Sequence, residues 1–121
     1  YAAAIDMCGW AETRGALIAV LSEHHGTDDG HLPVPLLLAS AIALTRPGGV
    51  VLYATCSPHL AETVGVVADA LRRQPVRALY TWPLFDPVPA GTGPHVQLWP
   101  HRHGTDAMFA AALRKDGPGA N

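Results

Sequence analysis

The predicted fold is decided by one stretch, Arg46-Pro47-Gly48-Gly49-Val50-Val51-Leu52-Tyr53-Ala54-Thr55-Cys56-Ser57-Pro58-His59. A proline followed by two glycines predicts a tight turn, and the apolar run that follows is rich in strand formers. Such a run predicts a buried strand that is covered on both faces, as in a parallel sheet. Because ligands gather beyond the carboxyl ends of parallel strands, chemistry is expected at Cys56, just after this strand.

The composition allows one hydrophobic core. The chain has 121 residues, of which 49% are hydrophobic, a formal charge of −2 and a pI near 6.4. This charge gives no global footprint for a polyanion. Two cysteines form no disulfide framework, and no signal-like segment precedes the body of the chain, so we expect a cytoplasmic protein. No apolar run reaches the length of a membrane span, and Tyr1 in place of Met indicates that the chain begins inside a larger protein.

The first third of the chain predicts three elements. We expect a short strand over Ala2–Ile5, because the loop-like residues Asp6 to Gly9 follow it. Ala11–Leu21 favours a helix, although its apolar run suits a strand nearly as well. Ser22–His31 has the composition of a loop, and Leu32–Leu44 predicts a helix that stops at the proline and glycines of the opening stretch.

The remainder predicts an α/β sheet with flanking helices. Apolar residues recur at helical spacing after the central strand, so an amphipathic helix is expected to begin near Ser57 or Pro58. A further strand is predicted over Val76–Trp82 and a proline-rich loop over Pro83–Pro94. Val96–Trp99 and Ala107–Leu113 predict a closing antiparallel hairpin. We expect residues 1–115 to form one domain and residues 116–121 to be a disordered tail.

Cys56 is the sharpest candidate for chemistry, since a partly exposed thiolate is a good nucleophile. On composition alone, a small buried residue at a strand end is the more common role of such a cysteine. If Ala2–Ile5 is a neighbouring parallel strand, Asp6 and Cys8 lie at the same sheet edge as Cys56. Together they could bind a planar substrate, or zinc with a nearby histidine, while Asp6 could equally cap a loop.

The histidines suggest a metal only weakly, because their spacing fits no closed zinc motif. His24, His25 and His31 lie near two aspartates, and His101 and His103 lie in a second polar segment. The segment from His101 to Asp106 could face a phosphate or order the active edge, and a solvated loop is the alternative.

Two ordered stretches resemble a known family. Residues Arg46 to Thr63, with Thr55-Cys56-Ser57 at their centre, closely resemble the Thr-Cys-Ser motif region of the Sun/Fmu family of ribosomal RNA cytosine-C5 methyltransferases. Gly93 to Phe109, which ends in Asp106-Ala107-Met108-Phe109, resembles the closing segment of its actinobacterial members. The resemblance covers roughly residues 32 to 115, the C-terminal part of such an enzyme.

The resemblance implies a class I, Rossmann-like methyltransferase sheet with S-adenosylmethionine as the methyl donor and RNA, in particular ribosomal RNA, as the substrate. It implies that Cys56 attacks carbon 6 of a cytosine so that carbon 5 can take the methyl group. A second family motif, Asp-Ala-Pro-Cys, would place Asp6 at the cofactor and Cys8 in product release, although Asp6-Met7-Cys8 is one residue shorter and lacks the proline. The family's glycine-rich cofactor loop lies upstream, so we expect the isolated chain to be inactive. A non-catalytic remnant or binding module of the same fold is the alternative.

Overall fold

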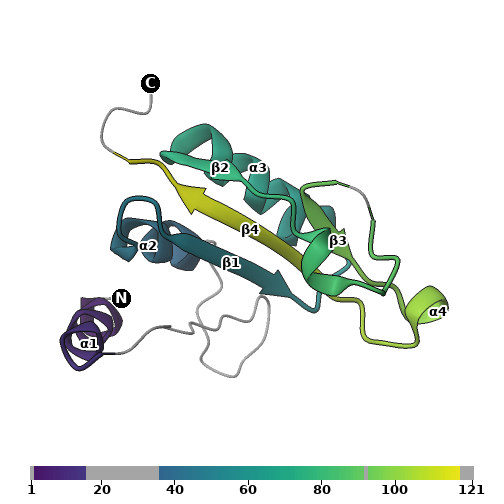
Figure 1. Ribbon diagram of the computed structural model, residues 1–121, viewed down its shortest axis with the longest axis horizontal. Coiled ribbons are helices and arrows are strands. Elements are labelled where there is room, and N and C mark those ends of the chain that lie inside the picture. Colours follow the sequence, from purple (N-terminus) through teal and green to yellow (C-terminus); the bar gives the residue numbers. More distant parts are fainter. Residues whose placement is uncertain (1, 16–35, 92, 118–121) are drawn as a thin grey trace. The chain divides into compact units, whose positions relative to one another are not determined.

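The computed structural model describes residues 2–15, 36–91 and 93–117 (Figure 1). The chain falls into two compact units, Tyr1–Leu44 and Thr45–Asn121, and each is described by itself. No helix among the described residues is long and apolar enough to cross a membrane.

The first unit begins with a helix, α1 (Ala2–Thr13), so the prediction of a strand over Ala2–Ile5 is wrong. Alanine is the best helix former, and the loop composition on which the strand prediction depended is accommodated within the helix. The helix ends before Gly15, whose φ of +85° is the left-handed conformation common after a helix end. The predicted helix Ala11–Leu21 overlaps only the last residues of α1, and residues 16–21 lie outside the described residues.

The second helix of this unit, α2 (Leu36–Leu44), confirms the described part of the helix that the sequence predicts over Leu32–Leu44. Leu38 and Ile42, four residues apart and therefore on one face, are 4% and 1% exposed. The predicted loop Ser22–His31 falls outside the described residues.

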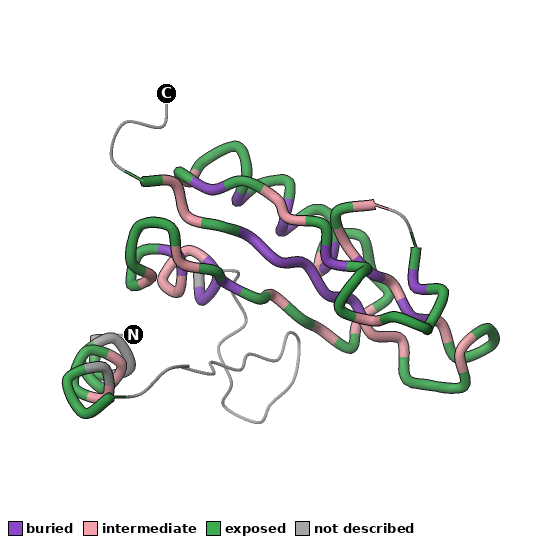
Figure 2. The backbone as a smooth tube through the Cα atoms, viewed as in Figure 1, coloured by how far each residue is buried: buried purple, intermediate pink, exposed green. Residues whose placement is uncertain are grey.

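The second unit is built on one strand, β4 (Phe109–Lys115), which lies in the centre of the sheet that the described residues form. β1 (Val50–Thr55) pairs with one edge of β4, while β2 (Val76–Ala78) and β3 (His95–Gln97) pair with the other. All three pairings are antiparallel. The buried run from Phe109 to Leu113 explains why β4 takes the central place, since its two faces are both covered (Figure 2).

β1 was predicted to be central and covered on both faces, and this is wrong. It pairs only with β4 among the described residues, and its burial alternates. Val51 is 8% exposed whereas Leu52 is 60% exposed. The apolar run identified a strand correctly, but a continuous run does not by itself show which strand is inserted between the others.

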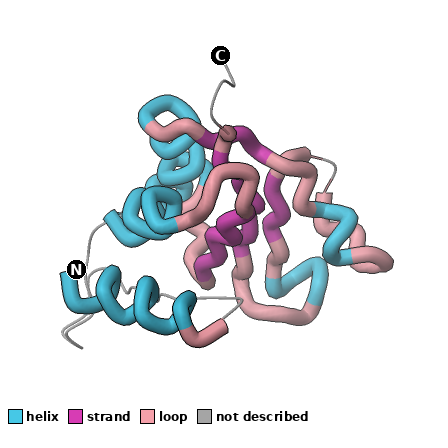
Figure 3. The backbone as a smooth tube through the Cα atoms, turned by 60° about the vertical axis from the view of Figure 1, so that its left-hand side comes forward, coloured by secondary structure: helices cyan, strands magenta, loops and turns pink. Residues whose placement is uncertain are grey.

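The connection from β1 to β2 has the expected α/β form. β1 and β2 both run antiparallel to β4, so they run parallel to each other, and α3 (Val64–Arg73) forms the crossover (Figures 1 and 3). α3 packs with buried Val66, Val67 and Ala70. The helix begins later than Ser57 or Pro58, because a short 3₁₀ helix, η1 (Leu60–Glu62), precedes it.

The segment after β2 is less regular than predicted. β2 has three residues in place of the predicted strand Val76–Trp82, and a 3₁₀ helix, η2 (Trp82–Phe85), occupies the start of the proline-rich loop. Beyond β2, the hydroxyl of Thr81 provides the next hydrogen bond to β4. It accepts the Ala112 N–H at 2.9 Å and donates to the Pro94 carbonyl at 2.7 Å.

The closing antiparallel hairpin is confirmed. β3 pairs with the first half of β4, with Gln97 opposite Phe109 and His95 opposite Ala111. The connection contains a short helix, α4 (Pro100–His103), which ends at Gly104 in the left-handed region with φ of +64°.

The turn that opens β1 has the predicted form. Gly49 N–H donates to the Arg46 carbonyl at 2.9 Å, and Gly48 has a φ of +77°, as a Pro-Gly turn of type II requires. At the other end of the unit, Asp116 pairs with Arg77 at 3.0 Å, while residues 118–121 of the predicted tail lie outside the described residues.

Candidate active site

Cys56 lies directly after the last residue of β1, as predicted, and its free thiol is exposed. The backbone on either side is fixed by two hydroxyl groups. Thr55 Oγ1 accepts the N–H of Ser57 at 3.2 Å, and Ser57 Oγ accepts the N–H of His59 at 3.1 Å. Each hydroxyl thus bonds the backbone two residues on, which is the local turn that serine and threonine favour. The motif Thr55-Cys56-Ser57 therefore encloses its cysteine in one side-chain turn, and a second such turn follows directly.

The loop is also tied to the start of the crossover. The hydroxyl of Thr63, which is 1% exposed, donates to the His59 carbonyl at 2.8 Å. The hydroxyl of Tyr53, on β1, donates to the Glu62 carbonyl at 2.8 Å. Both bonds join the strand end to η1 and α3, so the backbone around the thiol is held on both sides of the loop.

Met108 contacts the thiol from the hairpin side. The Cys56 thiol donates to the Met108 thioether with the two sulfur atoms 3.3 Å apart. Met108 precedes β4, and its carbonyl accepts the Leu98 N–H at 2.7 Å and the Gln97 side-chain amide at 3.2 Å. Met108 lies in the closing segment but had no predicted role, and the antiparallel pairing of Thr55 with Phe109 brings it to Cys56.

Asp6 and Cys8 are not at the end of a strand. Both lie within α1, where Asp6 is exposed and Cys8 is a half-buried free thiol. The prediction that they share a sheet edge with Cys56 depended on the strand that the structure does not form. Their roles at the cofactor and in product release stay predictions.

The described residues contain no group of three or more metal-ligating side chains. His24, His25 and His31 lie outside the described residues. His101 and His103 belong to α4, where the sequence predicted a polar loop.

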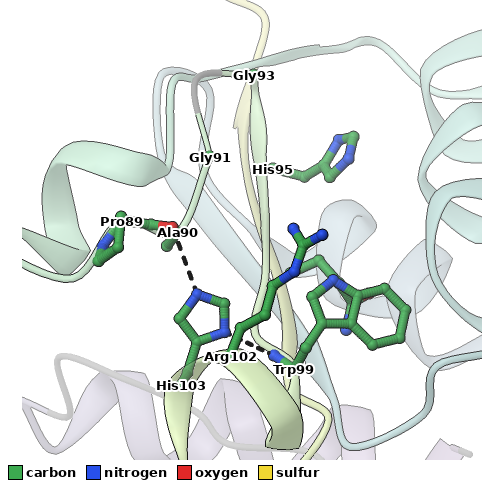
Figure 4. A pocket seen from close by; sticks show the side chains of 9 residues that line it. Pro89, Ala90, Gly91, Gly93, His95, Trp99, Arg102 and His103 are labelled. Carbon is green, nitrogen blue, oxygen red and sulfur yellow. Dashed lines mark hydrogen bonds between the residues drawn. The ribbon is translucent and has the colours of Figure 1, made fainter.

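An open pocket of about 580 Å³ lies between β3, α4 and the loop before β3 (Figure 4). His103 joins two of its walls: its Nδ1 accepts the backbone N–H of Trp99 at 2.8 Å, and its Nε2 lies 3.4 Å from the Pro89 carbonyl oxygen. The lining residues are Pro89, Ala90, Gly91, Gly93, His95, Gln97, Trp99, Arg102 and His103. A phosphate was one predicted ligand of the segment from His101 to Asp106, but no pocket was predicted from the sequence.

Solved structures with this arrangement define the class of the fold. The structure of NSun6 from Pyrococcus horikoshii with SFG matches with a TM-score of 0.59 and 26% identity, covering 69% of this chain and 21% of that one. The structure of PH0851 matches with a TM-score of 0.59 and 33% identity, covering 67% of this chain and 18% of that one. The fold is therefore that of a Rossmann-like methyltransferase, as predicted.

The family follows from the sequence comparison. A family model described as 16S rRNA methyltransferase RsmB/F matches residues 33–114, and the chain belongs to this family. "Putative methyltransferase Rv1407" of Mycobacterium tuberculosis is 84% identical over 81 residues, which cover 65% of this chain and 18% of that protein. The mitochondrial tRNA (cytosine(34)-C(5))-methyltransferase of Danio rerio is 49% identical over 39 residues, 32% of this chain and 11% of that protein. The chain thus matches less than a fifth of the length of these relatives.

Proposed function

We propose that this chain is the part of an RNA cytosine-C5 methyltransferase that carries the nucleophile, Cys56, and that its substrate is a cytosine in ribosomal RNA. The single observation that carries the proposal is the exposed thiol at the end of β1, which lies within one hydroxyl-backbone turn and directly before a second. Family membership and the cytosine-C5 activity in the name of the Danio rerio relative support the reaction class. The cytoplasm, where ribosomal RNA is abundant, is the location we propose.

The chemistry explains why a thiol is needed. Carbon 5 of cytosine is a poor nucleophile until a bond forms at carbon 6. In the proposed reaction the Cys56 thiol releases its proton to water and the thiolate bonds to carbon 6. The electron pair of the 5,6 double bond then forms the bond from carbon 5 to the methyl group, whose bond to the sulfonium sulfur of the donor breaks. A base then removes the carbon 5 proton, the double bond re-forms, and the thiolate leaves. The target base must be unstacked to reach the thiol, and the exposure of Cys56 allows such an approach.

The thiol must lose its proton before it attacks. In the resting structure the thiol donates to the Met108 thioether, which cannot accept a proton fully at neutral pH and so only orients the S–H group. Loss of the proton therefore ends the hydrogen bond from Cys56 to Met108 and leaves a thiolate that can attack the cytosine ring.

S-adenosylmethionine supplies an electrophilic methyl group when bound, and the neighbouring structure with SFG, an analogue of it, supports this cofactor. We propose that Asp6 helps to hold it. The Asp6 carboxylate is exposed and makes no hydrogen bond or ion pair with another described residue, so it has acceptor oxygens for the amino or hydroxyl groups of the cofactor. For Cys8, a free thiol on the same helix, we propose the role in product release.

The test is covalent trapping of the whole protein that carries this chain. RNA that contains 5-fluorocytosine cannot lose the carbon 5 substituent as a proton, so a methylated adduct with the nucleophile persists. We expect a protein–RNA adduct of slow electrophoretic mobility that is absent in Cys56→Ala and retained in Cys8→Ala, the matched control. An adduct that survives in Cys56→Ala would remove Cys56 from this role.

The alternative is a non-catalytic remnant. It is favoured by the departure of Asp6-Met7-Cys8 from the family motif and by the place of these residues in a helix. Trapping, together with calorimetry, distinguishes the enzyme from the remnant. A remnant forms no adduct in any variant and shows no calorimetric signal with S-adenosylmethionine. Binding of the cofactor together with the adduct dismisses it.

A further inference from the structure

We propose that the pocket between β3, α4 and the loop before β3 binds a nucleotide of the single-stranded RNA that flanks the target cytosine. This proposal rests on the proposed function, which identifies the bound nucleic acid as the RNA that contains the target cytosine. The pocket volume of about 580 Å³ lies within the range of 300–1,000 Å³ that is usual for small-molecule sites. It is therefore large enough for a base with its sugar and phosphate.

The charge of the pocket suits a phosphate. Arg102 brings a positive charge to its lining, His95 and His103 add imidazole groups, and none of the lining residues is a carboxylate. The Arg102 guanidinium is exposed and makes no hydrogen bond or ion pair with another described residue, so its donors are available to a ligand. The whole sequence is acidic, but the charge is divided unevenly. Residues 1–44 hold one Arg or Lys against five Asp or Glu, a formal −4, whereas residues 45–121 hold seven against five, a formal +2.

The aromatic side of the pocket suits a base. The half-buried Trp99 indole lies beside the Arg102 guanidinium (Figure 4). Proteins that bind single-stranded RNA without reading its sequence combine such a stacking surface with cationic groups that follow the backbone. A pocket open to solvent on one side suits a continuous strand better than a free small molecule, which is usually enclosed.

His103 holds this arrangement in place. Because its Nδ1 accepts the backbone N–H of Trp99 at 2.8 Å, the proton of the neutral ring is on Nε2, and that N–H points to the Pro89 carbonyl 3.4 Å away. The ring therefore joins α4 to the opposite wall of the pocket (Figure 4). Gly104 closes the short helix by donating its N–H to the Pro100 carbonyl at 3.0 Å. The backbone that carries Trp99 and Arg102 is thus fixed before any ligand binds.

The sheet register places this pocket beside the nucleophile. Thr55 of β1 and Gln97 of β3 both lie opposite Phe109, on its two sides, and β1 and β3 run in the same direction. Cys56 and Trp99, which follow these strand ends, therefore emerge at the same end of the sheet. Two strand spacings amount to roughly 10 Å, a distance that a short piece of extended single strand can bridge. When the target base of an RNA strand is unstacked, the nucleotides next to it must be bound by the protein, and the pocket binds one of them.

The experiment measures equilibrium binding of the whole protein to a short fluorescein-labelled single-stranded RNA with an ordinary cytosine, over a range of salt concentrations. Arg102→Gln should weaken binding and reduce the slope of log K against log salt by about 0.7, the value for one phosphate contact to a single strand. Arg72→Gln, which removes the same charge from the exposed face of α3, is the matched control and should leave the slope unchanged.

Stacking is tested separately. Trp99→Leu should weaken binding at least about fivefold without a change of salt slope, while Trp99→Phe, which keeps an aromatic face, should recover most of the affinity. Near-ultraviolet and far-ultraviolet circular dichroism checks that each variant folds. If Trp99→Leu does not fold, Trp99→Phe and Arg102→Gln still decide the matter.

Wild-type affinity and slope in Arg102→Gln would overturn the proposal, and so would wild-type affinity in a folded Trp99→Leu. An equal loss in Arg72→Gln, which would mean diffuse attraction, would overturn it as well. Full competition by free cytidine monophosphate at the concentration of the RNA would show a mononucleotide site and would also overturn it. Failure of the proposed function is distinguishable, because it shows as the lack of a Cys56 adduct with 5-fluorocytosine RNA, whereas the pocket is read from binding of unmodified RNA.

Discussion

Replacing Thr81 by valine should destabilise the protein by about 2–4 kcal/mol. Thr81 is 0% exposed, and its hydroxyl fills the gap between β2 and β3 on one edge of β4. Valine has the same shape but no hydroxyl, so the Ala112 N–H and the Pro94 carbonyl both lose their partner. No cavity forms, and the loss is therefore almost entirely one of hydrogen bonding.

The magnitude follows from how buried each partner is. Ala112 is 4% exposed, so its N–H meets the full cost of a buried unpaired donor, about 1–3 kcal/mol. Pro94 is exposed, and its carbonyl can bond to water, so it adds only the net worth of an ordinary hydrogen bond, about 1 kcal/mol. Thr81→Ser is the matched control, because it keeps the hydroxyl and loses one buried methyl group, which is worth about 1 kcal/mol.

The assay is urea unfolding followed by circular dichroism, with hydrogen exchange at the Ala112 amide as a local readout. We expect the order of stability wild type, Thr81→Ser, Thr81→Val, and faster exchange of the Ala112 amide in the valine variant alone. A valine variant within about 0.5 kcal/mol of the wild type would refute the reasoning, because the hydroxyl would then contribute nothing. A valine variant equal to the serine variant would also refute it, because the hydroxyl would then be worth no more than one buried methyl group.

Three further changes test the site and its support. Thr55→Val removes one of the two turns beside Cys56 at constant volume, and the loss of one hydrogen bond of about 1 kcal/mol should slow 5-fluorocytosine adduct formation roughly fivefold; an unchanged rate would contradict the role of the turn. Gly49→Ala would bring a Cβ to 2.6 Å from the Thr45 methyl group, so urea unfolding should show a loss of about 1–3 kcal/mol, and wild-type stability would contradict it. The pKa of Asp69 is lowered mainly by a hydrogen bond from the Arg73 side chain on α3. The ionised carboxylate therefore stabilises the fold above pH 3.8, and this stabilisation is lost as the pH falls through the lowered pKa of the folded state. The difference in Tm between wild type and Asp69→Asn should accordingly shrink in acid, and a difference that grows would contradict this.

The parts of the fold that the sequence predicted are those with a strong local pattern. Turn chemistry fixed the start of β1 at Gly48 and Gly49, and the apolar run identified the strand itself. The place of Cys56 was predictable for the same reason, because the apolar run ends just before it and so sets the end of the strand. The closing hairpin was predictable from two apolar runs with a polar connection.

The parts that were wrong depend on distant contacts. Ala2–Ile5 was too short to show a period, and its alanines fold as helix. The exposed face of β1 could not be predicted, since only the insertion of β4 between β1 and β2 decides which strand is central. Thr81 carries no sequence signal at all, because its two partners lie 13 and 31 residues away.

The candidate site likewise depends partly on local hydrogen bonds and partly on contacts between residues far apart in the sequence. Thr55 and Ser57 act on the backbone two residues on, so their effect on Cys56 is local and is contained in the motif. Met108 is 52 residues from Cys56 and reaches it only through the pairing of β1 with β4. The sequence could therefore predict the nucleophile but not the residue that contacts its sulfur.

β4 connects the nucleophile to the proposed RNA pocket, and its register is what makes the two compatible. Phe109 lies between Thr55 and Gln97, and its ring contacts Tyr53 and His95, with centroids 6.2 and 5.3 Å away. A slip of one residue would turn the buried Phe109 to the other face and would also withdraw the residue before it from the thiol. The fully buried Phe109 side chain specifies this register strongly. It therefore fixes the ends of β1 and β3, and with them the positions of the loops that carry Cys56 and Trp99. An RNA strand that enters the pocket consequently approaches Cys56 from a direction set by the core of the sheet, and not by the loops alone.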